Sequence, residues 1–287
     1  MKLVRYGDAG HEKPGLLDTA GRVRDLSGLV EDIHPRLLSP AGLRALRAVD
    51  ADLLPVVAGS PRMGMPWTGA GKFIAVGLNY LDHANEAGMA VPKEPILFTK
   101  AITCLQGPDD DVVLPLASVK TDWEVELGVV IGSTARNVSQ ERALDHVAGY
   151  CVVNDVSERE WQIERSNGQW DKGKGFDTFG PVGPALVTAD EVPDPQALRL
   201  WLDVNGERMQ TGSTATMIFP VAHLVSYISR FITLMPGDLI ATGTPPGVGM
   251  GMKPPKFLRA GDEVALGIEG LGTQRQKIVD RARSSAA

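Results

Sequence analysis

Three acidic residues stand in or just after segments whose composition is typical of buried strands. Glu124 and Glu126 are two positions apart, and side chains at positions i and i+2 of a strand point to the same side of a sheet. The pair could be the solvated face of a half-exposed strand, but the apolar continuation at residues 129–131 favours a strand buried on both faces. Asp155 follows the apolar residues 152–153 and would lie at a strand end, either as an ordinary turn residue or as a third carboxylate.

A divalent cation would explain why acidic residues occur in such segments. Buried carboxylates repel one another and lose hydration unless a positive charge neutralises them. Three carboxylates offer only oxygen ligands, which suit Mg²⁺, Mn²⁺ or Ca²⁺ rather than zinc. No histidine lies near Glu124, Glu126 or Asp155 in the sequence, which also counts against zinc.

His83 and Glu86 could form a pair that activates water. If residues 80–87 form a short helix, the two side chains are one turn apart and share a face. A carboxylate beside an imidazole raises its basicity and holds one tautomer, which is the minimum that a general base acting on water requires. The alternative is an ordinary pair on the surface of a helix.

Two glycine-rich segments could contact an anionic ligand. Residues 168–181 carry Lys172 and Lys174 among glycines and could form a mobile loop over an anion, although the spacing is not that of a Walker phosphate loop. Backbone amides in residues 242–249 could form an anion-binding concavity. The alternatives are a solvated loop for the first segment and a tight turn for the second.

Strands predominate among the elements that would position these residues. The 32 glycines and 20 prolines favour short strands joined by turns over a helical bundle. We expect strands at residues 2–6, 15–18, 23–26, 73–77, 96–99, 125–131, 150–153, 200–204, 238–241 and 263–266. Helices are expected at residues 40–49, 80–87 and 220–234, and Asn205-Gly206 indicates a hairpin. The predicted class is α+β and mainly β.

The chain is expected to divide into two domains. Residues 1–66 form a small N-terminal α+β domain in this prediction, with a linker at residues 59–66, and residues 67–287 form the catalytic domain.

Composition narrows the range of partners. The 29 basic and 35 acidic residues give a net charge of −6 without a basic stripe, so nucleic acid is not expected as a partner. There is no apolar run of about 18 residues, and the first residues lack the apolar core of a signal peptide, so neither a membrane partner nor secretion is expected. Cys104 and Cys151 are interpreted as buried free thiols, which favours a cytoplasmic location.

Together these segments resemble the fumarylacetoacetate hydrolase family over roughly residues 70–282. The resemblance lies in an ordered series of blocks: Gly-x-Asn-Tyr-x-x-His-x-x-Glu at 77–86, Pro-x-x-Phe-x-Lys at 95–100, Glu-x-Glu at 124–126, Asn-Asp at 154–155, Lys-Gly-Phe-Asp-Thr-Phe-Gly-Pro at 174–181, and Thr-Gly-Thr-Pro-x-Gly-Val-Gly at 242–249. It implies a mixed, mainly β roll or barrel with few helices, and a homodimer or higher homo-oligomer.

The resemblance also implies roles for individual residues. Glu124, Glu126 and Asp155 would hold Mg²⁺ or Mn²⁺, and Lys174 would lie beside the metal and the oxo group of the substrate. His83 and Glu86 would form the water-activating pair. The expected substrate contacts are Lys100, Arg159, Gln162, Gln169 and Thr244.

The implied reaction is hydrolysis of a carbon–carbon bond in a small 2,4-dioxo acid. Residues 169–174 look most like the bacterial branch that cleaves 2,4-diketo-3-deoxy derivatives of L-rhamnonate or L-fuconate, which would release pyruvate and a hydroxy acid such as lactate. Fumarylpyruvate or acylpyruvate hydrolysis and oxaloacetate decarboxylation are alternatives on the same site. A non-catalytic protein that binds metal or sugar acid is an alternative from a different class.

Overall fold

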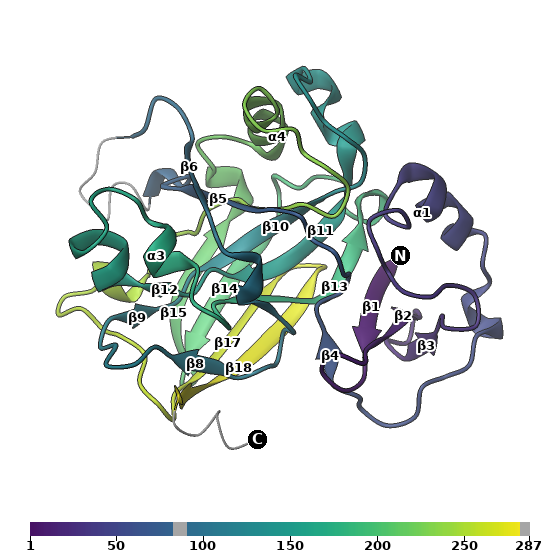
Figure 1. Ribbon diagram of the computed structural model, residues 1–287, viewed down its shortest axis with the longest axis horizontal. Coiled ribbons are helices and arrows are strands. Elements are labelled where there is room, and N and C mark those ends of the chain that lie inside the picture. The colour runs from purple at the N-terminus through teal and green to yellow at the C-terminus, as the bar shows by residue number, and fades with distance from the viewer. Residues whose placement is uncertain (83–90, 282–287) are drawn as a thin grey trace.

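The computed structural model describes residues 1–82 and 91–281 and is built around one large sheet (Figure 1). The eleven strands of this sheet include a path in the order β3-β2-β1-β13-β11-β10-β16-β5-β6, with β4 paired to β1 and β7 paired to β13. Their bounds are β1 Lys2–Tyr6, β2 Lys13–Leu17, β3 Val23–Asp25, β4 Met63–Gly64, β5 Phe73–Gly77, β6 Ile96–Thr99, β7 Leu105–Gln106, β10 Val125–Ile131, β11 Val147–Asn154, β13 Gly180–Thr188 and β16 Leu239–Ala241.

A second sheet packs against β10 and β11 at the centre of the first. Its five strands run in the order β15-β14-β17-β18-β8, and β9 and β12 form a separate pair. Their bounds are β8 Val112–Leu114, β9 Thr121–Asp122, β12 Ser157–Glu158, β14 Arg199–Val204, β15 Glu207–Ser213, β17 Glu263–Ile268 and β18 Gly272–Asp280. Every residue of β10 and of β11 is buried, so the prediction of a strand covered on both faces is confirmed for residues 125–131.

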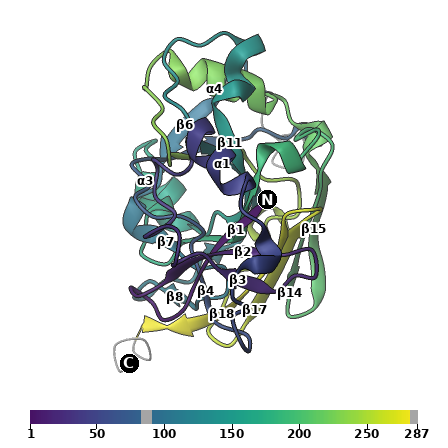
Figure 2. The ribbon, with the colours of Figure 1, turned by 90° about the vertical axis from the view of Figure 1, so that its right-hand side faces the viewer.

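Helices are short and few in the described part of the chain. They are α1 Pro40–Arg47, α3 Asp171–Lys174, α4 Val221–Ser229 and the π-helix η4 Glu160–Glu164, with brief 3₁₀ turns elsewhere. Figures 1 and 2 both place α4 far from β14, β17 and β18. The predicted α+β, mainly β class is confirmed. None of the helices in residues 1–82 and 91–281 is long and apolar enough to cross a membrane.

All the predicted strands occur, with ends that shift by a few residues, whereas two helices are shorter than predicted. Ser39 caps α1 by accepting from the Gly42 amide, as its position before Pro40 indicates, but α1 ends at Arg47. Helix α4 ends at Ser229 instead of continuing to residue 234, because the chain turns after Ser229 and Leu234 forms a β-bridge with Ala135. The helix predicted at residues 80–87 lies largely outside the described residues.

The N-terminal strands are continuous with the large sheet. Strand β1 pairs with β2 on one side and with β13 on the other, through Lys2 opposite Val187 and Leu3 opposite Leu186. The segment predicted as a linker, residues 59–66, contains strand β4, which pairs with β1. The first strands thus share hydrogen bonds with the rest of the sheet. The domain boundary at residue 66 stays a prediction.

Gly149 allows β11 and β13 to approach closely near the centre of the sheet. A Cβ atom at this position would lie 2.2 Å from the carbonyl oxygen of Val187. We expect Gly149→Ala to lower the free energy of unfolding by roughly 1–3 kcal/mol, because the added methyl group must push two strands apart. Urea denaturation would measure the loss. Gly28→Ala is the matched control, since nothing lies within 4 Å of a Cβ atom there, and an equal loss in both variants would contradict the explanation.

Candidate active site

The pairing of β10 with β11 brings the three predicted acidic residues together. Glu126 lies opposite Val153, and the Asp155 amide donates to the Glu124 carbonyl at 2.9 Å just beyond the strand ends. One carboxylate oxygen from each of Glu124, Glu126 and Asp155 lies within 4.8 Å of the other two, and all three residues are buried. The residues therefore form a candidate metal site, with only oxygen ligands.

Two buried lysines contact this acidic cluster. The Lys174 ammonium lies 2.7 Å from Glu124 Oε2 and 2.8 Å from Asp155 Oδ2, so it bridges two of the carboxylates. The Lys100 ammonium lies 2.5 Å from Asp155 Oδ1 and 3.1 Å from the Val156 carbonyl oxygen. Burial lowers the pKa of Lys174, but the charges of Asp155 and Glu124 outweigh this and raise its pKa above the usual value. Lys174 is therefore a fixed positive charge in the site.

Arg159 links the cluster to the loop after β16. Its guanidinium donates to Asp122 Oδ2 at 2.8 Å, to Glu124 Oε1 at 2.7 Å and to Gln162 Oε1 at 2.8 Å. Asp122 in turn accepts from the Gly249 amide at 2.7 Å and the Met250 amide at 3.0 Å. The planar donors of Arg159 are engaged by protein groups that orient Glu124. The expected role of Arg159 as a substrate contact stays a prediction.

The charges of the buried cluster leave one carboxylate without a cationic partner. Glu126 accepts from the Gly243 amide at 2.7 Å and forms no ion pair among the described residues. Burial raises the pKa of Glu126, and the charges of Asp155 and Glu124 raise it further. Burial also acts to raise the pKa of Glu124, but Lys174 and Arg159 outweigh it and lower that pKa to about 2.

A divalent cation fits this balance of charge. When every group is counted as ionised, Asp122, Glu124 and Asp155, which pair with Lys100, Arg159 and Lys174, together with the unpaired Glu126 give one more negative than positive charge. The Tyr80 hydroxyl is also buried without a hydrogen-bond partner in the described structure, and its pKa is raised by burial and then by the charge of Glu126. The donor set and the excess negative charge both suit Mg²⁺ or Mn²⁺.

Six of the predicted site residues line one cavity of about 260 Å³, namely Glu124, Glu126, Arg159, Gln162, Lys174 and Thr244. Asp155 and Lys100 are not among the lining residues, and their buried side chains pair with each other. Gln169 is exposed and does not line the cavity. His83 and Glu86 lie outside the described residues.

Thr244 is held by the scaffold through a residue that the sequence did not single out. The Thr244 hydroxyl donates to the Val125 carbonyl at 2.9 Å and accepts from Gln210 Nε2 at 2.8 Å, while Gln210 Oε1 accepts from the Val125 amide at 3.0 Å. Asp122 was also missed, although it precedes Glu124 by two positions and the strand alternation could have indicated it. Gln210 is distant in sequence, and no local pattern marks it.

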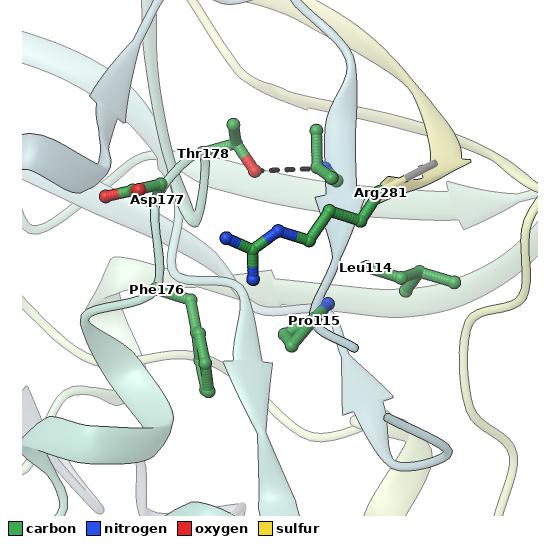
Figure 3. A pocket seen from close by; sticks show the side chains of 7 residues that line it. Leu114, Pro115, Phe176, Asp177, Thr178 and Arg281 are labelled. Carbon is green, nitrogen blue, oxygen red and sulfur yellow. Dashed lines mark hydrogen bonds between the residues drawn. The ribbon is translucent and has the colours of Figure 1, made fainter. Parts of the chain in front are cut away.

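The segment predicted as a mobile glycine-rich loop is ordered structure. Residues Asp171–Lys174 form α3, and Lys174 is 2% exposed. A different cavity of about 260 Å³ is lined by Phe176, Asp177 and Thr178, together with Pro115 and Arg281 (Figure 3). There the Thr178 hydroxyl accepts from the Val113 amide at 2.9 Å. The loop prediction is wrong for Lys174 because its ammonium is fixed by two buried carboxylates.

The chain is similar to known proteins over most of its length. The model of the family described as fumarylacetoacetate hydrolase, C-terminal, matches residues 72–279. A Burkholderia cenocepacia protein named "Putative hydrolase" is 64% identical over 281 residues, which covers 98% of this chain and 99% of that protein.

Two solved structures share the whole fold. Fumarylacetoacetate hydrolase from Exiguobacterium antarcticum has a TM-score of 0.85 at 36% identity, covering 98% of this chain and 100% of that one. Maleylpyruvate hydrolase from Sphingobium sp. SYK-6, in complex with manganese(II) and pyruvate, has a TM-score of 0.81 at 29% identity, covering 98% of this chain and 99% of that one. The acidic cluster at the paired ends of β10 and β11 thus occurs in a chain that belongs to the fumarylacetoacetate hydrolase family.

Proposed function

We propose that the chain is a Mg²⁺- or Mn²⁺-dependent hydrolase that cleaves the C3–C4 bond of a 2,4-dioxo acid and releases pyruvate. The observation that carries this proposal is the convergence of Glu124, Glu126 and Asp155 within 4.8 Å in a buried cluster that lacks one positive charge. The similarity to a maleylpyruvate hydrolase that binds manganese(II) and pyruvate supports the same head group.

The chain's own residues can stabilise the charge that this cleavage creates. A divalent cation held by the three carboxylates would supply Lewis-acid stabilisation of a negatively charged oxygen. Lys174 stays protonated beside Glu124 and Asp155, and so can donate a hydrogen bond to a substrate oxygen on which charge develops. Arg159 holds Glu124 in place, and the buried surroundings strengthen these interactions because they exclude water.

The proposed base is His83, oriented by Glu86, which would take a proton from the attacking water. Both residues lie outside the described part of the chain, and their roles rest on the resemblance of residues 77–86 to the family pattern.

The tail of the substrate is a separate question. The sequence favours a 2,4-diketo-3-deoxy sugar acid of the L-rhamnonate or L-fuconate type, while fumarylpyruvate, acylpyruvate and oxaloacetate share the same head.

Pyruvate release from a panel of 2,4-dioxo acids tests the proposal. We expect turnover in the presence of Mg²⁺ or Mn²⁺, loss of turnover after treatment with EDTA, and recovery when the cation is restored, because the site depends on a positive charge that the chain does not supply. Measuring carbon dioxide beside pyruvate separates oxaloacetate decarboxylation from hydrolysis. Turnover that is indifferent to EDTA, or no turnover on any member of the panel, would contradict the proposal.

A further inference from the structure

The cavity above the acidic cluster combines polar groups that are already engaged with a largely apolar wall. Among the described lining residues, Leu78, Phe98, Ile163, Trp170, Val248 and Met250 contribute hydrocarbon or aromatic side chains. The polar residues of the same lining bind one another or the backbone. Arg159 pairs with Glu124 and Gln162, and Lys174 pairs with Glu124. The head group of a dioxo acid can therefore use the cluster, while the rest of the molecule meets the wall.

Trp170 is the largest side chain of this wall, and it is held in place from two sides. A Cβ atom on Gly77 would lie 2.4 Å from Cζ3 of the Trp170 ring, so the ring rests directly on the backbone of β5. The rings of Trp170 and Phe98 have centroids 5.4 Å apart and are tilted by 58°. Lys174 Nζ lies 5.0 Å from the centre of the Phe98 ring, which places the aromatic pair next to the charged cluster. The position of Trp170 in the wall is thus fixed by contacts within the protein.

We propose that Trp170, which packs against Gly77 and Phe98, determines the preference among 2,4-dioxo acids. The preferred substrates have an apolar acyl tail, and the disfavoured ones have a tail with several hydroxyl groups. This inference rests on the proposed function. A hydroxylated tail placed against this wall loses its bonds to water, and the described lining offers it few free donors or acceptors in return. An alkyl tail loses no hydrogen bonds and gains burial. The apolar wall therefore favours a different tail from the sugar acid that residues 169–174 predict.

The test compares kcat/KM for two 2,4-dioxo acids of equal chain length, one with an alkyl tail and one with a polyhydroxylated tail. We expect the wild-type chain to prefer the alkyl substrate by about 10- to 100-fold. Trp170→Ala should reduce this ratio by about tenfold or more, and Trp170→Gln should reduce it further because the amide can bind hydroxyl groups. Trp161→Ala is the matched control, since that indole lies over Arg165 and does not line the cavity, and its ratio should stay at the wild-type value.

The outcomes separate this inference from the proposed function. Absence of pyruvate from both substrates and from the whole 2,4-dioxo acid panel would overturn the proposed function, whereas turnover of other panel members alone would overturn the preference for an alkyl tail. Pyruvate release from both with no preference, or with a preference for the hydroxylated tail, would overturn the role of the apolar wall alone. An unchanged ratio in folded Trp170→Ala and Trp170→Gln, with folding checked by circular dichroism, would overturn the assignment of selectivity to Trp170.

Discussion

The Glu124→Gln variant is expected to bind Mn²⁺ at least about 100-fold more weakly than the wild type and to show no measurable turnover. The substitution keeps the shape of the side chain but removes its charge. The pKa of Glu124 is lowered to about 2, so the wild-type side chain is ionised at neutral pH and counts fully as an anionic ligand. In the variant, Arg159 and Lys174 lose their shared carboxylate, and their positive charges then repel an incoming cation. Titration of Mn²⁺ followed by electron paramagnetic resonance measures the affinity, and pyruvate release measures turnover.

Asp238→Asn is a suitable control for the loss of a buried carboxylate. Asp238 is fully buried, lies 2.7 Å from the Lys72 ammonium, and does not line the cavity. This variant is expected to be less stable than the wild type while its Mn²⁺ affinity stays the same. If Glu124→Gln bound Mn²⁺ as tightly as the wild type, the carboxylates of Glu124, Glu126 and Asp155 would not be the metal site.

The acidic cluster could be predicted from sequence because strand geometry is local. The two-residue period predicts that Glu124, just before β10, and Glu126 within it share one side, and Asp155 directly follows the mainly apolar strand β11. What the local pattern could not indicate is which residues neutralise the cluster. Lys100 reaches Asp155 across 55 positions, and only the pairing of distant strands brings them together.

Two long strands escaped prediction because their patterns differ from the usual alternation of apolar and polar residues. Strand β13 contains Pro181 and Pro184, which normally argue against a strand. In β18 two of the three buried positions are taken by Gln274 and Gln276, so the buried face looks largely polar. These amides are satisfied inside the protein: Gln274 donates to the Val152 carbonyl at 2.7 Å, and Gln276 accepts from Asn154 at 3.0 Å. The second sheet is thereby hydrogen-bonded to the strand that ends at the acidic cluster.

The Lys174→Met variant is expected to lose roughly 3–5 kcal/mol of stability without metal, because Glu124 and Asp155 would face each other with one cation fewer. Mn²⁺ should restore more stability to this variant than to the wild type, since the ion supplies the missing positive charge. Turnover should nevertheless stay about 10²- to 10³-fold lower at saturating Mn²⁺, because the lysine ammonium that lines the cavity is no longer there to stabilise the developing negative oxygen. Thermal unfolding with and without Mn²⁺, beside the pyruvate assay, measures both effects. Lys72→Met is the matched control: it breaks the pair with Asp238 outside the cavity and leaves the cation site intact, so Mn²⁺ should stabilise it only as much as it stabilises the wild type. Equal stabilisation of the two variants by Mn²⁺ would show that Lys174 does not share the charge of the cation site.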